Sequence, residues 1–580
     1  MEIKEKYQRL LKAWCDGMLD HQITGIKGRG IEGGLICPAC SMIHGRCYGA
    51  AHPLLYMAKL TGENKYALAA EQLIFWSDHM ECPDGSFVND AASLWKGITA
   101  FSAAALMKSR YLYAELLSGK AIAELDRKIR RSLDFLADKL EPHQANINYL
   151  IGTAYALALG GKYTENQYYL DKARKYAEEM LQNTTESGLL RGEGKPWDLV
   201  TEKGCSAVDI GYNVEEAVSM MALYAHEMGD RDYLKRTAAI AKAHAAFLLP
   251  DGGWDNSFGS RLDKWTYWGS RTSDGCQPGY VILQQYEPDL ALIAERNLEQ
   301  LERCTYDGLL YGGRGLRHHG ELPCIHHTFT HANGLAEALE WMEENIATPV
   351  REKNLPQPCK YYPELDTWLY SDNTWRATVT GYDFHDKANN HATGGALSLL
   401  YHLQAGPILA AGMTEYSRFE LLNTQRILED ADTPLALRLQ RKQDGVIFSN
   451  ILDRKAIITH TAPNIFFVEG HITDDDGNPP PEAESKFTAE YKFSEGKTEI
   501  TFTHTASALT LYIPALLEAG DVLEGLTIKK GKYVVKLTAS QPVTVLPGRW
   551  FSHVPGFEAA PYLIENVAGS CTVTFSVEQI

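Results

Sequence analysis

The chain has 580 residues, of which 45% are hydrophobic and 22% charged, a composition typical of a globular protein with two or three domains. Its formal net charge of −18 argues against nucleic acids and anionic membrane surfaces as partners. No apolar run approaches the roughly 20 residues that span a bilayer, and the opening MEIKEKY lacks the apolar segment of a signal peptide. We therefore expect a cytoplasmic protein, unless a signal peptide has been removed from the sequence.

Eleven cysteines are scattered along the chain, and one cluster stands apart from the others. Cys37, Cys40, His44 and Cys47 follow the spacing C-x2-C-x3-H-x2-C, which supplies four potential ligands for a tetrahedral zinc ion. A structural zinc ion is one interpretation of this run, and buried thiols near a pocket wall are the other. We expect the activity itself to require no cofactor.

A degenerate helical repeat fills the first 345 residues. Amphipathic helices are predicted over 94–117, 122–140, 148–159 and 214–226. Turns of the Asp-Gly-apolar type separate the repeats at 84–87, 187–190, 251–254 and 307–310. Eleven or twelve helices in hairpins predict an α/α toroid over residues 1–350, expected to be an (α/α)6 ring with a pocket at one rim.

Two acidic segments of the predicted toroid contain candidates for catalytic acids and bases. Glu193 lies in a Gly-rich loop, while Glu215 and Glu216 follow Tyr212 by three and four residues and so share its helix face. Carboxylates in a first helical turn also stabilise the helix dipole, so a capping role is the alternative. The functional interpretation is a pair of carboxylates across a pocket, as glycoside hydrolysis requires.

The segment 251–275 combines aromatic and cationic side chains without helical or strand periodicity. It is predicted to be a long functional loop in which flat aromatic rings stack on sugars and cations bind a carboxylate. The alternative is a loop whose aromatic rings cover the core. The candidate substrate-binding residues of this loop are Trp254, Lys264, Trp265, Trp268 and Arg271.

A histidine-rich stretch at 314–331 is predicted to contact the substrate. His326, His327 and His331 lie at the start of a predicted helix, and His327 and His331 are four residues apart. That spacing suits a metal, but no H-E-x-x-H pattern accompanies it. We favour hydrogen bonding to the substrate, with His327 as a catalytic candidate.

The pattern of the chain changes beyond the toroid. Residues 351–367 are rich in Pro and polar residues and predict a linker, and residues 368–580 predict an antiparallel β-sandwich. The strongest alternating runs lie at 446–448, 456–460, 465–468, 499–504, 509–513, 533–537 and 572–577.

The order of toroid and sandwich, together with the segments 146–149 and 389–402, resembles the heparinase II/III-like superfamily of uronate polysaccharide lyases. The resemblance implies that Asn148 neutralises a substrate carboxylate and that Tyr212 and a histidine, with His391 as the match, transfer protons. Tyr149 departs from the pattern, since those lyases usually carry His there. The Trp-Tyr-Trp-Gly-Ser-Arg loop and the Gly-Tyr-Asn-Val-Glu-Glu segment look more like a family of β-glucuronidases built on the same two domains.

The sequence therefore predicts an exo-acting β-glucuronidase, a glycoside hydrolase with an oligosaccharide substrate bearing glucuronate. The first alternative is a uronate lyase acting by β-elimination, and the second is an acidic-glycan-binding protein without catalysis. A homo-oligomer stays open as a further possibility.

Overall fold

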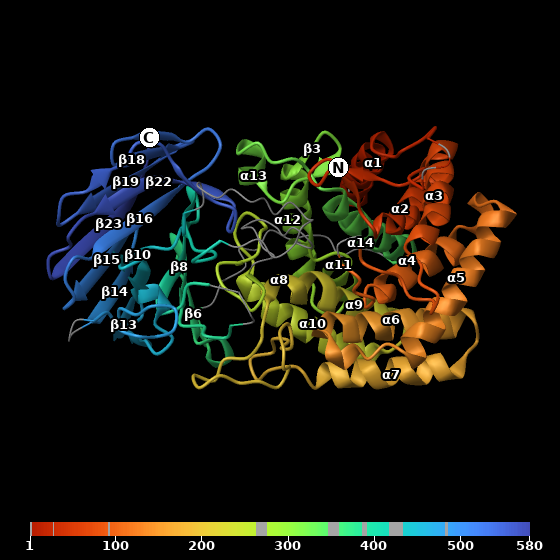
Figure 1. Cartoon of the computed structure of the whole chain (residues 1–580), viewed down its shortest axis with the longest axis horizontal. Helices are drawn as coiled ribbons and strands as arrows, with labels where there is room; N and C mark the ends of the chain where they lie inside the picture. The colour runs from red at the N-terminus through yellow and green to blue at the C-terminus, as the bar shows by residue number, and fades with distance from the viewer. Residues whose placement is uncertain are drawn as a thin grey trace.

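A computed structural model of the chain describes residues 3–26, 28, 30–90, 93–262, 275–345, 359–385, 391–416, 433–481 and 485–580. Helices fill the first part of the chain and antiparallel strands the second, side by side along the long axis of the molecule (Figure 1). No helix in the described ranges has the length and apolar character needed to cross a membrane.

The helices of the first part are interrupted by short turns and two-residue strands. Their bounds are α1 (Ile3–Asp20), α2 (Ala51–Thr61), α3 (Asn64–Trp76), α4 (Thr99–Leu112), α5 (Gly119–Asp138), α6 (Ile147–Tyr163), α7 (Gln167–Leu181), α8 (Ile210–Tyr212), α9 (Val218–Met228), α10 (Arg231–His244), α11 (Gly279–Leu283), α12 (Leu290–Arg303), α13 (Arg314–His318) and α14 (Ile325–Glu344). The short strands are β1 (Ile36–Cys37), β2 (Met42–Ile43), β3 (Thr305–Tyr306) and β4 (Leu309–Leu310).

The long helices form a closed ring of pairs. Among the described residues, six pairs pack together: α2 with α3, α4 with α5, α6 with α7, α9 with α10, α11 with α12, and α14 with α1. The first helix of each pair also contacts the first helix of the next, and α14 closes the ring against α2. The (α/α)6 toroid expected from the repeat is confirmed.

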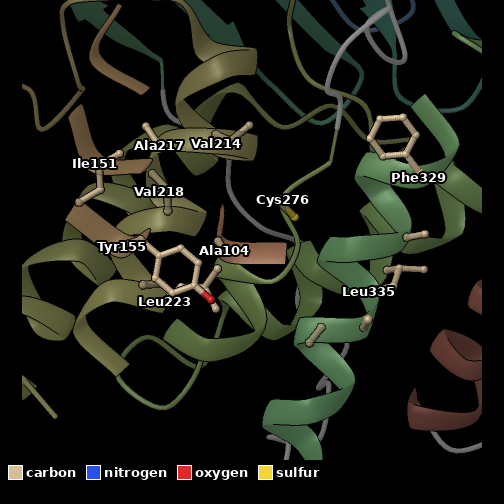
Figure 2. Close-up of a cluster of buried hydrophobic side chains, with 14 of the residues drawn as sticks. Ala104, Ile151, Tyr155, Val214, Ala217, Val218, Leu223, Cys276, Phe329 and Leu335 are labelled. Carbon is tan, nitrogen blue, oxygen red and sulfur yellow. The ribbon is translucent and has the colours of Figure 1, made fainter. Parts of the chain in front are cut away.

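Burial separates the inner helices from the outer ones. Nearly every residue of α6 is buried, as expected for a helix that is apolar all round, whereas α5 and α7 bury only one stripe. Figure 2 shows some of the buried side chains between the inner helices, including Ala104 of α4, Tyr155 of α6, Val218 of α9 and Leu335 of α14.

Three antiparallel sheets make up the second part. The five-stranded sheet has the order β5-β6-β7-β8-β9; the next has β11-β10-β16-β22-β20 with β21 beside β22; the largest has β12-β13-β14-β15-β23-β19-β18-β17. The strands are β5 (Lys360–Tyr362), β6 (Thr367–Ser371), β7 (Trp375–Thr380), β8 (Ala396–His402), β9 (Gly406–Ala410), β10 (Arg438–Gln443), β11 (Val446–Ser449), β12 (Ile457–Ala462), β13 (Ile465–His471), β14 (Lys486–Ser494), β15 (Lys497–His504), β16 (Thr510–Leu517), β17 (Val522–Glu524), β18 (Thr527–Lys530), β19 (Tyr533–Ala539), β20 (Thr544–Val545), β21 (Trp550–Ser552), β22 (Phe557–Ile564) and β23 (Ser570–Gln579).

The five-stranded sheet joins the two parts of the molecule because both of its faces are buried. Along β8, Leu399 and Tyr401 pack into the core of the toroid, and Leu400 between them packs into the core of the sandwich. Side chains alternate between the faces of a strand, so one strand serves both cores. The sandwich predicted from the alternating runs is confirmed, and every run named above contains or overlaps a strand.

The boundary between the two parts differs in one respect from the prediction. The segment 351–367 was expected to be a linker, but β5 begins at Lys360 and pairs with β6 through Tyr362. A composition rich in Pro and polar residues concealed a short strand at the edge of the sheet, where Pro is tolerated.

Candidate active site

Arg261 is the centre of the candidate site. Its Nη1 donates to Glu193 Oε2 at 3.0 Å, and its guanidinium lies 3.9 Å from the centroid of the Tyr212 ring. The backbone N–H of the same residue donates to Asp209 Oδ2 at 3.1 Å. The arginine thus joins two other segments of the chain, one that carries Glu193 and one that carries Asp209 and Tyr212.

The position of Arg261 follows from the packing of the loop that precedes it. Asp255 accepts a hydrogen bond from Thr378 of β7 at 2.5 Å, and Ser257 bonds to Ser398 of β8 at 2.9 Å. Ser260 donates its N–H to the Val208 carbonyl at 3.0 Å and its hydroxyl to the Glu193 carbonyl. The five-stranded sheet therefore holds this loop against the rim of the toroid.

Glu193 is a buried acid with an altered titration. Its side chain is fully buried, and burial raises its pKa from the ordinary 4.5 to about 7, although the Arg261 cation acts in the opposite direction. The Asn148 N–H donates to its other oxygen at 3.1 Å. Near neutral pH this carboxyl is therefore divided between its acid and its anion.

Tyr212, Glu215 and Glu216 lie on one irregular helix. Asp209 Oδ1 caps its start by accepting from the Tyr212 N–H at 3.0 Å, and residues 213–217 form a single π-helical turn between α8 and α9. Such turns often occur at functional sites. The Glu216 carboxylate accepts a hydrogen bond from the Asn148 side chain, so Asn148 joins the two predicted carboxylates Glu193 and Glu216.

A cavity of ≈ 110 Å³ lies between the inner helices beside this cluster. Glu215 and Glu216 line it together with Arg46, Gln277, Phe329 and Glu337. Gly275 lies close to the Glu215 carboxylate, since a Cβ atom built on it would lie 2.5 Å from Glu215 Oε2. Burial raises the pKa of Glu337, which accepts a hydrogen bond from Tyr155 at 3.2 Å.

The three predicted histidines of α14 have different surroundings. His331 Nδ1 contacts the His327 carbonyl at 2.6 Å, and its Nε2 lies 3.8 Å from Glu215 Oε1. His327 is fully buried, and His326 stacks on His44 with ring centroids 4.2 Å apart. The His331 ring therefore lies beside Glu215, a carboxylate that lines the cavity.

Two other predicted substrate ligands lie outside this cluster. Trp254 is 1% exposed and packs edge-on against Tyr280, with ring centroids 5.7 Å apart, so it belongs to the core and offers no face to a sugar. His391 is buried in the second part of the molecule, where its Nε2 contacts the Phe384 carbonyl at 3.0 Å and its ring stacks on His385. Lys264, Trp265, Trp268 and Arg271 fall outside the described residues.

The cysteine cluster differs from the predicted ligand set. The Sγ atoms of Cys37 and Cys324 are 3.9 Å apart, and the Cys40 thiol interacts with both. Cys47 is buried elsewhere against the Leu35 backbone, because the chain turns into a helical segment directly after His44. Among the described residues, the carboxylates of Asp78, Glu81 and Glu124 have oxygen atoms within 4.8 Å of one another, but Arg127 and Lys128 neutralise them.

Sequence reasoning missed Arg261, Asp209 and Cys324. Arg261 belongs to the segment 251–275 but was not selected as a ligand, since nothing in the sequence shows which cation of this segment faces Glu193. Asp209 had a readable signal, because an Asp directly before the first buried residues of a helix is a typical N-cap. Cys324 had no such signal, because it lies 277 positions after Cys47 in the sequence.

Comparison with known proteins settles the family. Residues 11–358 match the N-terminal domain of ulvan lyases, and residues 359–579 match their C-terminal domain. The chain belongs to the ulvan lyase family. A broad-specificity ulvan lyase of Formosa agariphila is 35% identical over 586 residues, covering 97% of this chain and 92% of that protein.

Solved structures share the fold at low sequence identity. A heparan sulfate lyase from Pedobacter heparinus aligns with a TM-score of 0.50 at 11% identity, covering 98% of this chain and 83% of its own. A heparinase III aligns with a TM-score of 0.51 at 11% identity, covering 100% and 86%. These likenesses confirm the resemblance to the heparinase II/III-like architecture.

The family also corrects the predicted activity. The glycoside hydrolase prediction, a β-glucuronidase, is wrong, since the family matched over both domains and the curated relative are lyases. The prediction took the carboxylates Glu193, Glu215 and Glu216 as the candidates for an acid–base pair. In the structure Glu193 pairs with an arginine, an arrangement equally suited to binding an anionic substrate.

Proposed function

We propose that the chain is a lyase that cleaves a uronate-containing polysaccharide by β-elimination, with ulvan as the first candidate substrate. The observation that carries the proposal is the placement of Arg261 between Glu193 and the ring of Tyr212, at the rim of a toroid of the ulvan lyase family. The relative from Formosa agariphila, named for its action on ulvan, supports the choice of substrate.

The reaction makes three demands on the site. A base removes the proton from C5 of the uronate, the electron pair forms the C4–C5 double bond, and the C4–O4 bond breaks as the leaving oxygen takes a proton. Charge accumulates on the uronate carboxylate as the C5 proton leaves, so a fixed cation there lowers the barrier. Arg261 supplies that cation and pairs with Glu193. Asn148 donates its backbone N–H to Glu193 and its side-chain amide N–H to Glu216.

The hydrogen bonds of His331 fit the role of the base. Its Nδ1 donates to the His327 carbonyl, which leaves Nε2 to accept a proton. Glu215, 3.8 Å from Nε2, would stabilise the imidazolium that results. Tyr212, against whose ring the Arg261 guanidinium packs, supplies the proton for the leaving oxygen.

The products distinguish the two chemistries directly. Elimination from ulvan oligosaccharides yields an unsaturated uronate that absorbs in the ultraviolet and adds no water to the summed mass of the products, whereas hydrolysis adds one. Products that gain water and show no new absorbance would overturn the proposal. Binding of the oligosaccharides without any product would favour the glycan-binding alternative.

Two variants with matched controls test the proton chemistry. Tyr212→Phe and His331→Ala should each lower kcat at least about a hundredfold, the scale of general acid–base catalysis. Tyr233→Phe removes a buried hydroxyl that bonds to the Ala177 carbonyl, and His21→Ala removes an imidazole that contacts a carbonyl four residues earlier, like that of His331. Both controls lie away from the cavity and should retain activity; full activity of the site variants would contradict the assigned roles.

A further inference from the structure

Arg46 is a second arginine beside the candidate active site. It directly precedes the short 3-10 helix Cys47–Ala50 and lines the cavity between the inner helices. Its half-buried guanidinium lies 5.7 Å from the centroid of the Phe101 ring of α4, within the range of a cation–π contact. Among the described residues, no carboxylate forms an ion pair with this guanidinium. In a chain of net charge −18, Arg46 therefore offers its N–H donors to an anionic ligand.

A row of aromatic rings extends from Arg46 to the surface. Phe101 packs against Tyr149 of α6 with ring centroids 5.6 Å apart, and Tyr149 packs edge-on against Trp95 at 5.3 Å. Phe101 and Tyr149 are half-buried, whereas Trp95 is 38% exposed. Aromatic rings offer flat apolar faces on which the C–H faces of sugars can pack. The row therefore suits a sugar that approaches Arg46 from solvent.

The same row adjoins the residues assigned to elimination. Tyr149 follows Asn148, whose side chain donates to Glu216, and Glu216 lines the cavity together with Arg46. Burial and the charge of Glu216 raise the pKa of Tyr149, while the cations of Arg46 and Arg261 act in the opposite direction. Both cations therefore act on one ring, which places them on neighbouring parts of one binding surface.

The cavity beside Arg46 has room for a charged substituent of a sugar. Its volume of ≈ 110 Å³ is several times the roughly 10–15 Å³ that one water molecule needs. Phe101 and Phe329 form apolar parts of its wall, and Glu216 and Glu337 supply oxygens that can accept hydrogen bonds from sugar hydroxyls. A wall with a cation, carboxylates and aromatic rings suits a sugar that bears both an anion and hydroxyls.

We propose that Arg46, with the row Phe101, Tyr149 and Trp95, forms a second subsite that selects glycans with an oxyanion on the sugar next to the cleaved uronate. The inference rests on the proposed function, because it places the cleaved uronate at Arg261. The oxyanion is a sulfate ester or a carboxylate, since a guanidinium fork binds the paired oxygens of both. Tyr149, which departs from the sequence pattern of the heparinase-like lyases, belongs to this subsite.

Oligosaccharides that share the cleaved uronate and differ on the next sugar test the subsite. That sugar carries a sulfate ester, a carboxylate or only hydroxyls. The unaltered chain should have a KM at least about tenfold lower for one of the two anionic oligosaccharides than for the neutral one, the scale of a hydrogen bond to a charged group. Arg46→Ala should raise that KM to the value for the neutral oligosaccharide with little change in kcat. The oligosaccharide whose KM depends on Arg46 identifies the oxyanion.

Arg110→Ala is the matched control for the loss of an arginine. The Arg110 guanidinium also lies near a tyrosine ring, 5.3 Å from that of Tyr111, but it pairs with Asp126 and does not line the cavity. This variant should keep the preference for the anionic oligosaccharide. Equal KM values of the unaltered chain for all three oligosaccharides, or a preference that persists in Arg46→Ala, would overturn the inference.

The assay separates this inference from the proposed function. KM is measured from new reducing ends, which elimination and hydrolysis both release, so the preference can be determined whichever reaction occurs. Products that gain water would contradict elimination alone, whereas loss of the preference would contradict the subsite alone.

Trp95→Ala tests the aromatic row independently of Arg46, at an exposed ring whose loss the fold should tolerate. It should raise KM severalfold for all three oligosaccharides. Tyr168→Ala, which removes an exposed ring of α7, is the control and should leave KM unchanged. An unchanged KM in Trp95→Ala would remove the row from the subsite.

Discussion

The guanidinium of Arg261 covers the ring of Tyr212 at 3.9 Å while one of its nitrogens pairs with Glu193 at 3.0 Å. The two contacts use the flat face and the edge of the same cation, which a lysine cannot do. A substrate carboxylate entering here would meet a fixed cation that is already oriented by its neighbours.

Replacement of Arg261 tests this arrangement. Arg261→Ala should lower kcat/KM by about 2 kcal/mol or more in transition-state stabilisation, roughly thirtyfold, the scale of losing a charged hydrogen-bond partner. Arg261→Lys should recover only part of the loss, because an ammonium neither stacks flat nor binds in a fork. Arg110→Ala, which breaks an ion pair with Asp126 between α4 and α5, is the control and should leave kcat/KM unchanged.

The titration of Glu193 predicts how substrate binding depends on pH. Since burial raises its pKa to about 7, the carboxyl is neutral below this pH and anionic above it. The anion competes with the substrate carboxylate for Arg261, so KM should be lowest below about pH 7 and should rise above it, by up to tenfold per pH unit. Initial rates measured by ultraviolet absorbance across this range give the profile.

Glu193→Gln is the decisive comparison for that profile. The amide resembles the protonated acid and does not titrate, so KM should stay low and nearly constant across the same range. An equal rise of KM in the variant would show that another group is responsible.

Asp209 and Asp230 permit a paired test of positioning. Each caps a helix by accepting an N–H three residues later, from Tyr212 at 3.0 Å and from Tyr233 at 2.9 Å. Each Asp→Ala change should cost about 1 kcal/mol in the free energy of unfolding. Only Asp209 also binds the backbone of Arg261, so only Asp209→Ala should lower kcat, and equal losses of kcat in both variants would contradict this.

Trp254 should affect stability and not substrate binding. Its indole is buried against Tyr280, so Trp254→Ala should destabilise the fold by about 3–5 kcal/mol, measured by chemical denaturation. The folded fraction should retain its KM. Tyr168→Ala, at an exposed aromatic residue of α7, is the control for loss of a ring and should change stability far less.

The periodicity of the sequence was sufficient to predict the fold. Helices α4, α5, α6 and α9 lie within or close to the predicted ranges. The apolar residues of α5 form a stripe at helical spacing, whereas α6 is apolar all round and buried. The strand β5 was missed because it is three residues long and shares its composition with a linker. Such short edge strands are defined by their partner, which is a property of the fold and not of the local sequence.

The candidate site was predictable only in part, since its geometry depends on contacts between distant segments. Asn148, Glu193, Tyr212 and Glu216 were chosen for their residue types, and the structure places them together. Trp254 was misinterpreted because glycines around an aromatic residue are typical of exposed loops, whereas its indole packs against Tyr280 in the core of the toroid. The choice of hydrolysis failed because acidic side chains serve as acids, bases or arginine partners, and only the three-dimensional arrangement separates these roles.

The π-helical turn at 213–217 has a consequence for how this site can change. A π turn is equivalent to one residue inserted into an α-helix, and each residue of an α-helix turns the chain by about 100°. Deletion of a single residue within the turn would therefore re-aim Glu215 and Glu216 while α9 kept its apolar face against α6. A change in this turn can therefore alter the direction of the Glu215 and Glu216 carboxylates without altering how the helices of the ring pack.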